Sequence, residues 1–241
     1  MNLNLDKLRT LRLTTEKLDS SLSIETSKLL DESYLKNYLV SLQHHIGAAN
    51  IKVAASIFIK RYAFLSVIYL YTMTTCNKRL NISFENVSLE TKDSDELWLP
   101  FFYFHHLDVQ NLEGNREDWR ESSIESLFKE HLSPILNILS NVAKVSKLVL
   151  WENIAVYIFW LYETVLLEEE ISRNVVKRAE EDFHFILSPT SSKLFGEYSE
   201  NPLARYYKKE LGIRGRKRIT CCYSHLTNSG KYCTTCPHIK N

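Results

Sequence analysis

Hydrophobic positions follow the period of an α-helix over most of the chain. In residues 29–46 apolar side chains recur every three or four positions, which predicts a helix with one buried face: Leu30, Tyr34, Leu35, Tyr38, Leu39 and Leu42. Gly47 favours the end of this helix. Residues 52–75 are apolar on nearly every side except at Lys60 and Arg61, so we expect a helix in the middle of the domain, with these two cations at the edge of the core.

Three further segments have helical patterns. Residues 119–142 predict a helix that is interrupted near Pro134, and residues 145–169 predict a second core helix. Residues 171–186 predict an amphipathic helix with three carboxylates facing outward: Glu180, Glu181 and Asp182. The mixed polarity up to about Ser27 predicts one short helix and a strand.

The strand signals are fewer and shorter. Between Arg79 and Glu90 apolar and polar residues alternate, which predicts two short antiparallel strands. The aromatic segment 98–104 predicts a third strand, at the edge of its sheet because Pro100 cannot donate a ladder hydrogen bond. The expected fold class is α+β, mostly α-helical with a small antiparallel β element and a C-terminal iron–sulfur lobe.

Composition is that of a globular protein rather than of a nucleic-acid-binding or membrane-spanning one. The 241 residues are 44% hydrophobic and 24% charged, and 30 basic side chains balance 29 acidic ones. The apolar runs 53–73 and 148–167 are interrupted by charged residues, which favours buried helices over bilayer spans. The first residues mix charges with leucines and lack the apolar run of a signal peptide, so we expect a cytoplasmic protein.

From Pro189 onward turn-forming residues become frequent, which predicts a linker into a small C-terminal lobe. We therefore divide the chain into a mainly helical substrate-binding domain, residues 1–188, and a cluster-binding region, residues 189–241. Basic residues gather in the second region, with only Glu210 among them: Arg205, Lys208, Lys209, Arg214, Arg216, Lys217 and Arg218.

Four of the five cysteines lie within sixteen consecutive positions: Cys221, Cys222, Cys233 and Cys236. A Cys-x-x-Cys turn directs both sulfurs to one metal, and a vicinal pair can do so only where the backbone turns. Four thiolates suit zinc or an iron–sulfur cluster, and the unequal pairs favour a two-iron cluster over a single tetrahedral ion. A vicinal disulfide would be strained. Cys76 lies far from the motif and is interpreted as an inert buried thiol.

The segment Arg218-Ile-Thr-Cys221-Cys222-Tyr, followed after ten residues by Cys233-Thr-Thr-Cys236-Pro, resembles the C-terminal motif of the FhuF-like ferric siderophore reductases. In that family Cys-Cys-x10-Cys-x2-Cys binds a [2Fe-2S] cluster, and all four positions match. Weaker similarity runs through residues 60–65 and 150–153. The resemblance implies a [2Fe-2S] cluster on the four cysteines and a cytoplasmic oxidoreductase that releases ferrous iron from a ferric siderophore of hydroxamate or citrate type.

The chemistry of this reaction asks little of side chains, so no catalytic residue is assigned. Basic residues near the cluster would stabilise it and attract an anionic chelate, and the expected substrate contacts are Arg61, Arg205, Lys217 and Arg218. A proton for a freed chelating oxygen could come from His225 or His105. The adjacent His105 and His106 are otherwise interpreted as structural.

The sequence has no Gly-rich phosphate loop or dinucleotide fingerprint, so electrons are expected from an external donor protein such as a ferredoxin or flavoprotein. Transient association with the inner face of the membrane near a siderophore importer is a further expectation. Two alternatives stay open: a zinc-stapled binding protein, for example for nucleic acid, and a [2Fe-2S] electron carrier without its own substrate. The basic run lacks the aromatic pattern of a nucleic-acid-binding module.

Overall fold

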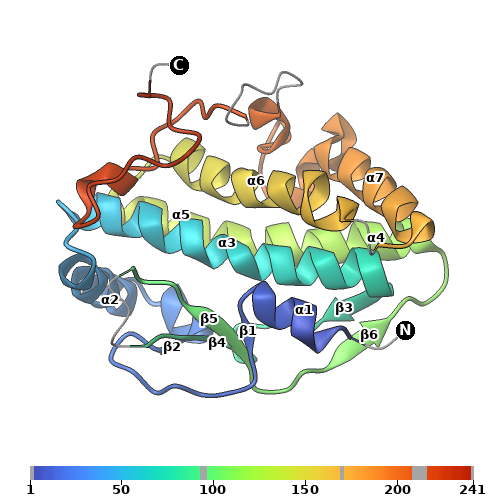
Figure 1. Ribbon diagram of the computed structural model, residues 1–241, viewed down its shortest axis with the longest axis horizontal. Helices are drawn as coiled ribbons and strands as arrows, with labels where there is room; N and C mark the ends of the chain where they lie inside the picture. The colour runs from blue at the N-terminus through green and yellow to red at the C-terminus, as the bar shows by residue number, and fades with distance from the viewer. Residues whose placement is uncertain (1–2, 93–96, 169–170, 208–215, 240–241) are drawn as a thin grey trace.

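The computed structural model describes residues 3–92, 97–168, 171–207 and 216–239. The long helix α3 (Ile51–Cys76) runs through the middle of the molecule, with α6 (Lys147–Glu163) and α7 (Arg173–Leu187) on one side and the strands on the other (Figure 1). Helix α2 (Glu32–His45) packs against α3 near its start. The predicted helices over 29–46, 52–75, 145–169 and 171–186 are therefore confirmed, with shifted ends. The short α1 (Leu5–Thr10) near the N-terminus is confirmed as well.

Helix α3 forms because its sequence supplies both caps and a side-chain surface that can be buried all round. The Asn50 side chain accepts the Val53 N–H at the start, and Asn77 ends the helix in the left-handed conformation. Both α3 and the run Lys147–Leu167 are long and apolar enough to cross a membrane by length and composition, but 83% and 67% of their most apolar windows are buried inside the fold. A buried core helix passes the same test, so this is weak evidence for a membrane span.

The predicted break at Pro134 is wrong. Helical backbone continues through α4 (Arg116–Glu125), the π-helix η2 (Ser126–Leu132) and α5 (Ser133–Ala143). Pro134 lies in the first turn of α5, directly after the wider π-helical turns, where its missing N–H interrupts no regular ladder. The helical backbone therefore continues through Pro134.

The strands form two small sheets, so the class is α+β and mostly helical, with a mixed rather than wholly antiparallel β element. The larger sheet has the order β1-β5-β4-β2, with β1 parallel to β5, and consists of β1 (Leu13–Thr14), β5 (Phe101–Phe104), β4 (Val87–Glu90) and β2 (Ile24–Glu25). The smaller sheet pairs β3 (Lys78–Leu80) with β6 (Val109–Asn111).

Two strand predictions are corrected by this topology. The strands predicted between Arg79 and Glu90 do not pair with each other, because β3 and β4 belong to different sheets. Strand β5 is not an edge strand: it begins at Phe101, just after Pro100, so the proline removes no ladder hydrogen bond from it.

The carboxylate of Asp182, predicted to face outward, is buried instead. It accepts two hydrogen bonds from Arg116 of α4, at 2.8 and 2.9 Å, and one from Thr74 of α3 at 2.9 Å. Arg120 lies 3.8 Å from the same carboxylate. This pairing compensates the cost of burial and links α3, α4 and α7.

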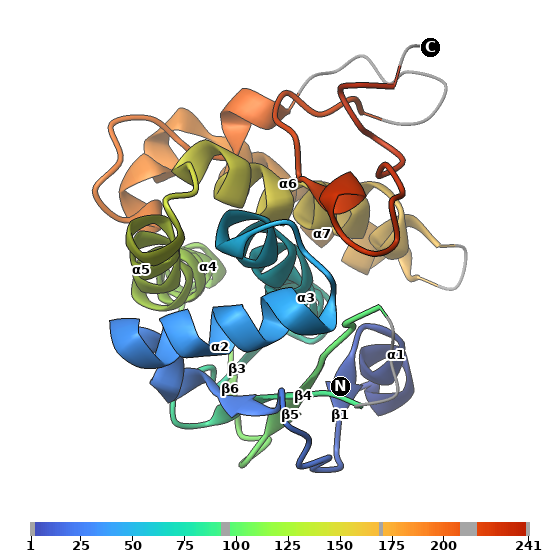
Figure 2. The same cartoon turned by 90° about the vertical axis from the view of Figure 1, so that its left-hand side faces the viewer.

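The chain after α7 consists of short 3₁₀ helices and loops. The helices η4 (Pro189–Phe195) and η5 (Ala204–Tyr206) pack Phe195, Leu203 and Tyr206 into the same core as the preceding helices. The remaining 3₁₀ helices are η1 (Thr26–Leu30), η3 (Val165–Leu167) and η6 (Ser224–Leu226). Residues 216–239 lie over α3 and α6 (Figures 1 and 2). The division of the chain at residue 188 stays a prediction.

Candidate metal centre

The four cysteines of the motif lie in segment 216–239, and a buried carboxylate fixes the start of this segment on helix α6. Glu152, which is 2% exposed, accepts the backbone N–H groups of Ile219 at 2.6 Å and Thr220 at 2.7 Å. It also accepts the Thr220 hydroxyl, and its carboxylate lies 3.6 Å from the Arg218 guanidinium. The residues immediately before Cys221 are therefore held on α6.

A second buried contact holds the vicinal cysteines on helix α3. The Ser56 hydroxyl donates to the Cys222 carbonyl at 2.9 Å. Asn153 of α6 in turn donates its amide to the Ser56 hydroxyl at 2.9 Å and to the Ser56 carbonyl at 3.0 Å. Ser56 and Asn153 are both fully buried, so this three-residue connection is shielded from water.

The loop between the two cysteine pairs is fixed on the turn between α2 and α3. The Ala49 N–H donates to the Leu226 carbonyl and the Asn228 N–H donates to the Ile46 carbonyl, both at 3.0 Å. Gly47 has φ +56°, and a Cβ there would lie 1.8 Å from the Asn228 side-chain oxygen. Glycine suits this left-handed backbone conformation, and a larger residue there would have to displace the Asn228 side chain.

Three of the four sulfurs lie within hydrogen-bonding distance of a backbone N–H or a hydroxyl group. The Tyr223 N–H donates to Cys221 Sγ at 3.3 Å, and the His238 N–H donates to Cys236 Sγ at 3.4 Å. In each turn the donor is the second residue after the cysteine. The Ser224 hydroxyl lies 3.1 Å from Cys222 Sγ. Hydrogen bonds to the sulfurs stabilise their charged form and tune any iron bound to them.

Cys222 is the sulfur best suited to carry negative charge. A hydrogen bond from the Cys233 thiol, followed by the nearby charge of Lys60 and the bond with Ser224, lowers the Cys222 pKa well below its usual value despite burial. The same hydrogen bond and burial raise the pKa of Cys233. Lys60 Nζ lies 3.9 Å from Cys222 Sγ and 3.0 Å from the Ser224 hydroxyl. The pKa values of these two neighbouring thiols are therefore shifted in opposite directions, beside a lysine.

The four cysteines are neighbours but do not form a closed metal site as they stand. Cys221 lies close enough to Cys222 and Cys236 for their charges to add to burial in raising its pKa. Among the residues that the structure describes, no three His, Cys, Asp or Glu side chains are arranged to hold a metal ion. All four thiols are free, and their softness and hydrogen-bonding partners fit an iron–sulfur cluster or a zinc ion by donor chemistry.

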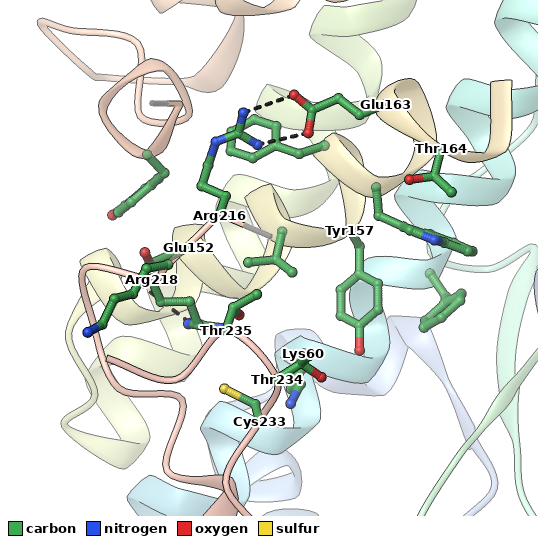
Figure 3. Close-up of a pocket in the computed structure, with 16 residues that line it drawn as sticks. Lys60, Glu152, Tyr157, Glu163, Thr164, Arg216, Arg218, Cys233, Thr234 and Thr235 are labelled. Carbon is green, nitrogen blue, oxygen red and sulfur yellow. Dashed lines mark hydrogen bonds and ion pairs between the residues drawn. The ribbon is translucent and has the colours of Figure 1, made fainter. Parts of the chain in front are cut away.

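A cavity of about 530 Å³ adjoins the cysteines, between segment 216–239 and the helices α3 and α6. Cys233, Lys60 and Arg218 are among its lining residues. Figure 3 shows Cys233 and Lys60 near one end of the cavity, and the ion pair of Arg216 with Glu163 near the other. The candidate redox centre therefore borders a cavity large enough for a ligand, with Cys233 as the residue that belongs to both.

The four predicted substrate contacts differ in their position relative to the cavity. Lys217 and Arg218 line the cavity, although Arg218 is buried and lies against Glu152. Arg61 is absent from the lining, but it donates to the hydroxyl of Tyr157, which lines the cavity, at 3.4 Å. Arg205 is exposed and lies over the ring of Tyr206. Whether these residues contact substrate stays a prediction.

Several other residues singled out in the sequence either do not line the cavity or lie outside the described residues. The His225 ring stacks on Tyr232 and the His105 ring bonds to Ser88, and neither histidine lines the cavity. Cys76, expected to be a buried thiol, is half-buried at the last position of α3. The predicted basic residues Lys208, Lys209 and Arg214 lie outside the described residues.

The polar anchors of the site were missed from the sequence. Ser56, Glu152 and Asn153 interrupt two otherwise apolar helices, and all three are buried on the faces that hold segment 216–239. A buried polar residue needs a partner, so such interruptions are a usable signal for a docking surface. The sequence predicts Lys60 as a cation at the edge of the core, and its position beside Cys222 was not predicted.

Comparison with known protein families gives a match to the family described as "Ferric iron reductase FhuF-like transporter", over residues 56–209. This match covers more than half of the chain, and the chain belongs to that family. The matched region contains Ser56, Glu152 and Asn153, and it ends before Cys221. No curated protein matches the sequence. The family assignment indicates a ferric reductase function linked to siderophore iron.

Proposed function

We propose that this chain reduces siderophore-bound ferric iron by one electron and releases it as ferrous iron. One observation carries the proposal: Cys233, a member of the four-cysteine motif, lines a cavity of about 530 Å³ that also presents lysine and arginine side chains. A chelate in this cavity would lie beside Cys233 without any intervening layer of protein. Membership of the FhuF-like family supports the same reaction class.

The four motif cysteines would hold a [2Fe-2S] cluster, and such a cluster supplies one electron at a time. The protein's own contribution is a set of polar groups placed around these sulfurs. Cys221 and Cys236 each accept a backbone N–H, from Tyr223 and His238 respectively. The Ser224 hydroxyl lies within hydrogen-bonding distance of Cys222, and Lys60 offsets negative charge beside it. The anchors Glu152 and Ser56 hold the vicinal cysteines on the helices, and the Arg218 N–H donates to the Thr235 carbonyl of the second turn at 2.9 Å.

The reaction needs no nucleophile and no general acid. Siderophore oxygens bind Fe³⁺ strongly and the less charged Fe²⁺ far more weakly, so the added electron itself releases the metal. The electron balance is Fe³⁺ plus one electron giving Fe²⁺. We propose an external ferredoxin or flavoprotein as the source of the electron, and the cytoplasm, near the inner face of the membrane, as the place of the reaction.

The experiment is a single-turnover reaction without oxygen. The purified protein is reduced chemically, which should bleach its visible absorption and give a paramagnetic one-electron state. Addition of a ferric siderophore should restore the oxidised spectrum while a ferrous trap registers about one iron per cluster, because the cluster holds one electron.

Two results would contradict the proposal. A colourless protein with one zinc per chain would indicate a zinc-stapled binding protein. A coloured protein whose reduced form ignores every ferric siderophore, yet reduces a protein acceptor, would indicate an electron carrier.

A further inference from the structure

Three aromatic side chains form part of the cavity wall, and they come from the two long core helices. The ring of Phe64 of α3 contacts the rings of Tyr157 and Trp160 of α6, with centroid distances of 4.7 and 6.2 Å. Arg61 donates to the Tyr157 hydroxyl and so helps to hold this ring. We call Phe64, Tyr157 and Trp160 the aromatic platform.

Core packing does not account for the exposure of this platform. The other three tryptophans, Trp98, Trp119 and Trp151, are at most 7% exposed, whereas Trp160 is 38% exposed. A tryptophan that keeps much of its ring in water gives up a large part of its hydrophobic stabilisation. Partly exposed aromatic rings gathered in a cavity are the usual feature of a surface that binds an organic ligand.

The charges around the same cavity select the sign of the ligand. Four cations line it, Lys60, Arg216, Lys217 and Arg218, against two carboxylates, Glu152 and Glu163. Each carboxylate is paired with an arginine, Glu163 with Arg216 and Glu152 with Arg218. Lys60 lies 3.9 Å from Cys222 Sγ and offsets negative charge there. Lys217 is then the cavity-lining cation that has no carboxylate partner among the lining residues, and it favours a negatively charged ligand.

We propose that the aromatic platform binds the organic frame of an anionic ferric chelate, with the iron-binding oxygens directed toward Cys233 and Lys60. The inference rests on the proposed function for the identity of the ligand, but not for any electron transfer. It names the substrate class more closely: chelators that combine carboxylates with apolar arms, rather than small chelators such as citrate alone. The platform then acts as the specificity-determining surface.

Binding can be tested apart from reduction with gallium(III), which forms similar complexes but accepts no electron from the protein. The probes are the gallium complex of a citrate–hydroxamate chelator with apolar arms and gallium citrate. Trp160 is the exposed member of the four tryptophans, so the first complex should change the tryptophan fluorescence of the wild-type protein. Trp160→Phe should bind the complex but lose most of this fluorescence change.

Calorimetry with the same complexes gives the affinities. Trp160→Leu should bind the citrate–hydroxamate complex about tenfold more weakly than wild type, because leucine offers the apolar arms less contact area than the indole ring. Its affinity for gallium citrate should change less than about twofold. Leu148→Ala is the matched control, because Leu148 is also an exposed apolar residue of α6 but does not line the cavity. It should keep wild-type affinity for both complexes.

An unchanged affinity of Trp160→Leu for the citrate–hydroxamate complex would overturn the inference, and so would an equal loss for gallium citrate. The outcome is separable from that of the proposed function. If gallium binding depends on the aromatic platform but the protein fails to reduce ferric iron, the platform is supported as a binding surface and the proposed reductase function is rejected. If Trp160→Leu changes neither the reduction of ferric siderophores nor gallium binding, the reductase function is supported and the role of the platform is rejected.

Discussion

The carboxylate of Glu152 and the guanidinium of Arg218 lie 3.6 Å apart, and both side chains are at most 3% exposed. Glu152 belongs to helix α6, inside the region that matches the family, whereas Arg218 begins the stretch that carries the four cysteines. The same carboxylate accepts the N–H groups of Ile219 and Thr220. One buried side chain therefore joins the helical part of the protein to its candidate metal centre.

Glu152→Gln should loosen this junction. The substitution leaves the buried Arg218 charge without its partner and replaces one acceptor oxygen by a donor, which we expect to cost about 3 kcal/mol. Hydrogen exchange in residues 216–239 should rise more than exchange in α3. Glu163→Gln is the control, since the Glu163–Arg216 pair is partly exposed and should contribute less. Equal effects of the two variants would show that Glu152 has no special role as an anchor.

Cys222→Ser should lose iron and sulfide, or bind them weakly, whereas Cys76→Ser should retain both. Cys222 is buried in the motif beside Lys60, and Cys76 ends helix α3 away from segment 216–239. Iron and acid-labile sulfide per chain, measured on protein purified without oxygen, give the answer. Similar losses in both variants would mean that the assigned ligand set is incorrect.

Lys217→Gln should slow the reaction with anionic ferric chelates more than with neutral ones, by a few-fold, because Lys217 is exposed and lines the cavity. Added salt should reproduce part of the difference through screening. Arg205→Gln is the matched control: Arg205 is also exposed but does not line the cavity. Rates are measured by stopped flow with a ferrous trap. A charge-independent loss in Lys217→Gln would reject electrostatic steering at this position.

His131 should make the fold less stable in mild acid. Burial lowers the pKa of His131 to about 4, and its Nε2 lies 2.6 Å from the Tyr62 hydroxyl. The unfolded chain takes up this proton near pH 6.5, so the stabilisation is complete above that pH and is lost as the pH falls toward 4. The loss between pH 7 and pH 5 should be roughly 2 kcal/mol.

Chemical denaturation at both pH values measures this effect of His131. His131→Gln should flatten the dependence on pH even if the variant is less stable overall, while His184→Gln, at an exposed position of α7, should retain the wild-type slope. An unchanged slope in His131→Gln would assign the acid sensitivity to other groups.

The sequence by itself determined the helices and the four-cysteine motif. Apolar periodicity over residues 29–46 and 52–75 is a local property, and burial of the resulting faces follows wherever the helices pack. The spacing of Cys221, Cys222, Cys233 and Cys236 is equally local, because short turns limit which sulfurs can approach one another. The same motif led to the family that the match over residues 56–209 confirms.

Tertiary structure decided which distant groups meet. Strand β3 pairs with β6, and β4 pairs with β2 and β5, so the pairing depends on tertiary packing that alternation within 79–90 does not encode. Asp182 is buried because Arg116 reaches it, although its position on an amphipathic helix favoured solvent.

The cavity is the clearest case of a feature that only the tertiary structure decided. Its aromatic platform, Lys60 and Cys233 come from two helices and a separate segment, which no local pattern brings together. They meet because buried polar groups such as Ser56, Asn153 and Glu152 each found a partner in the folded chain, and a side chain's partner is a property of the packed molecule rather than of its neighbours in sequence.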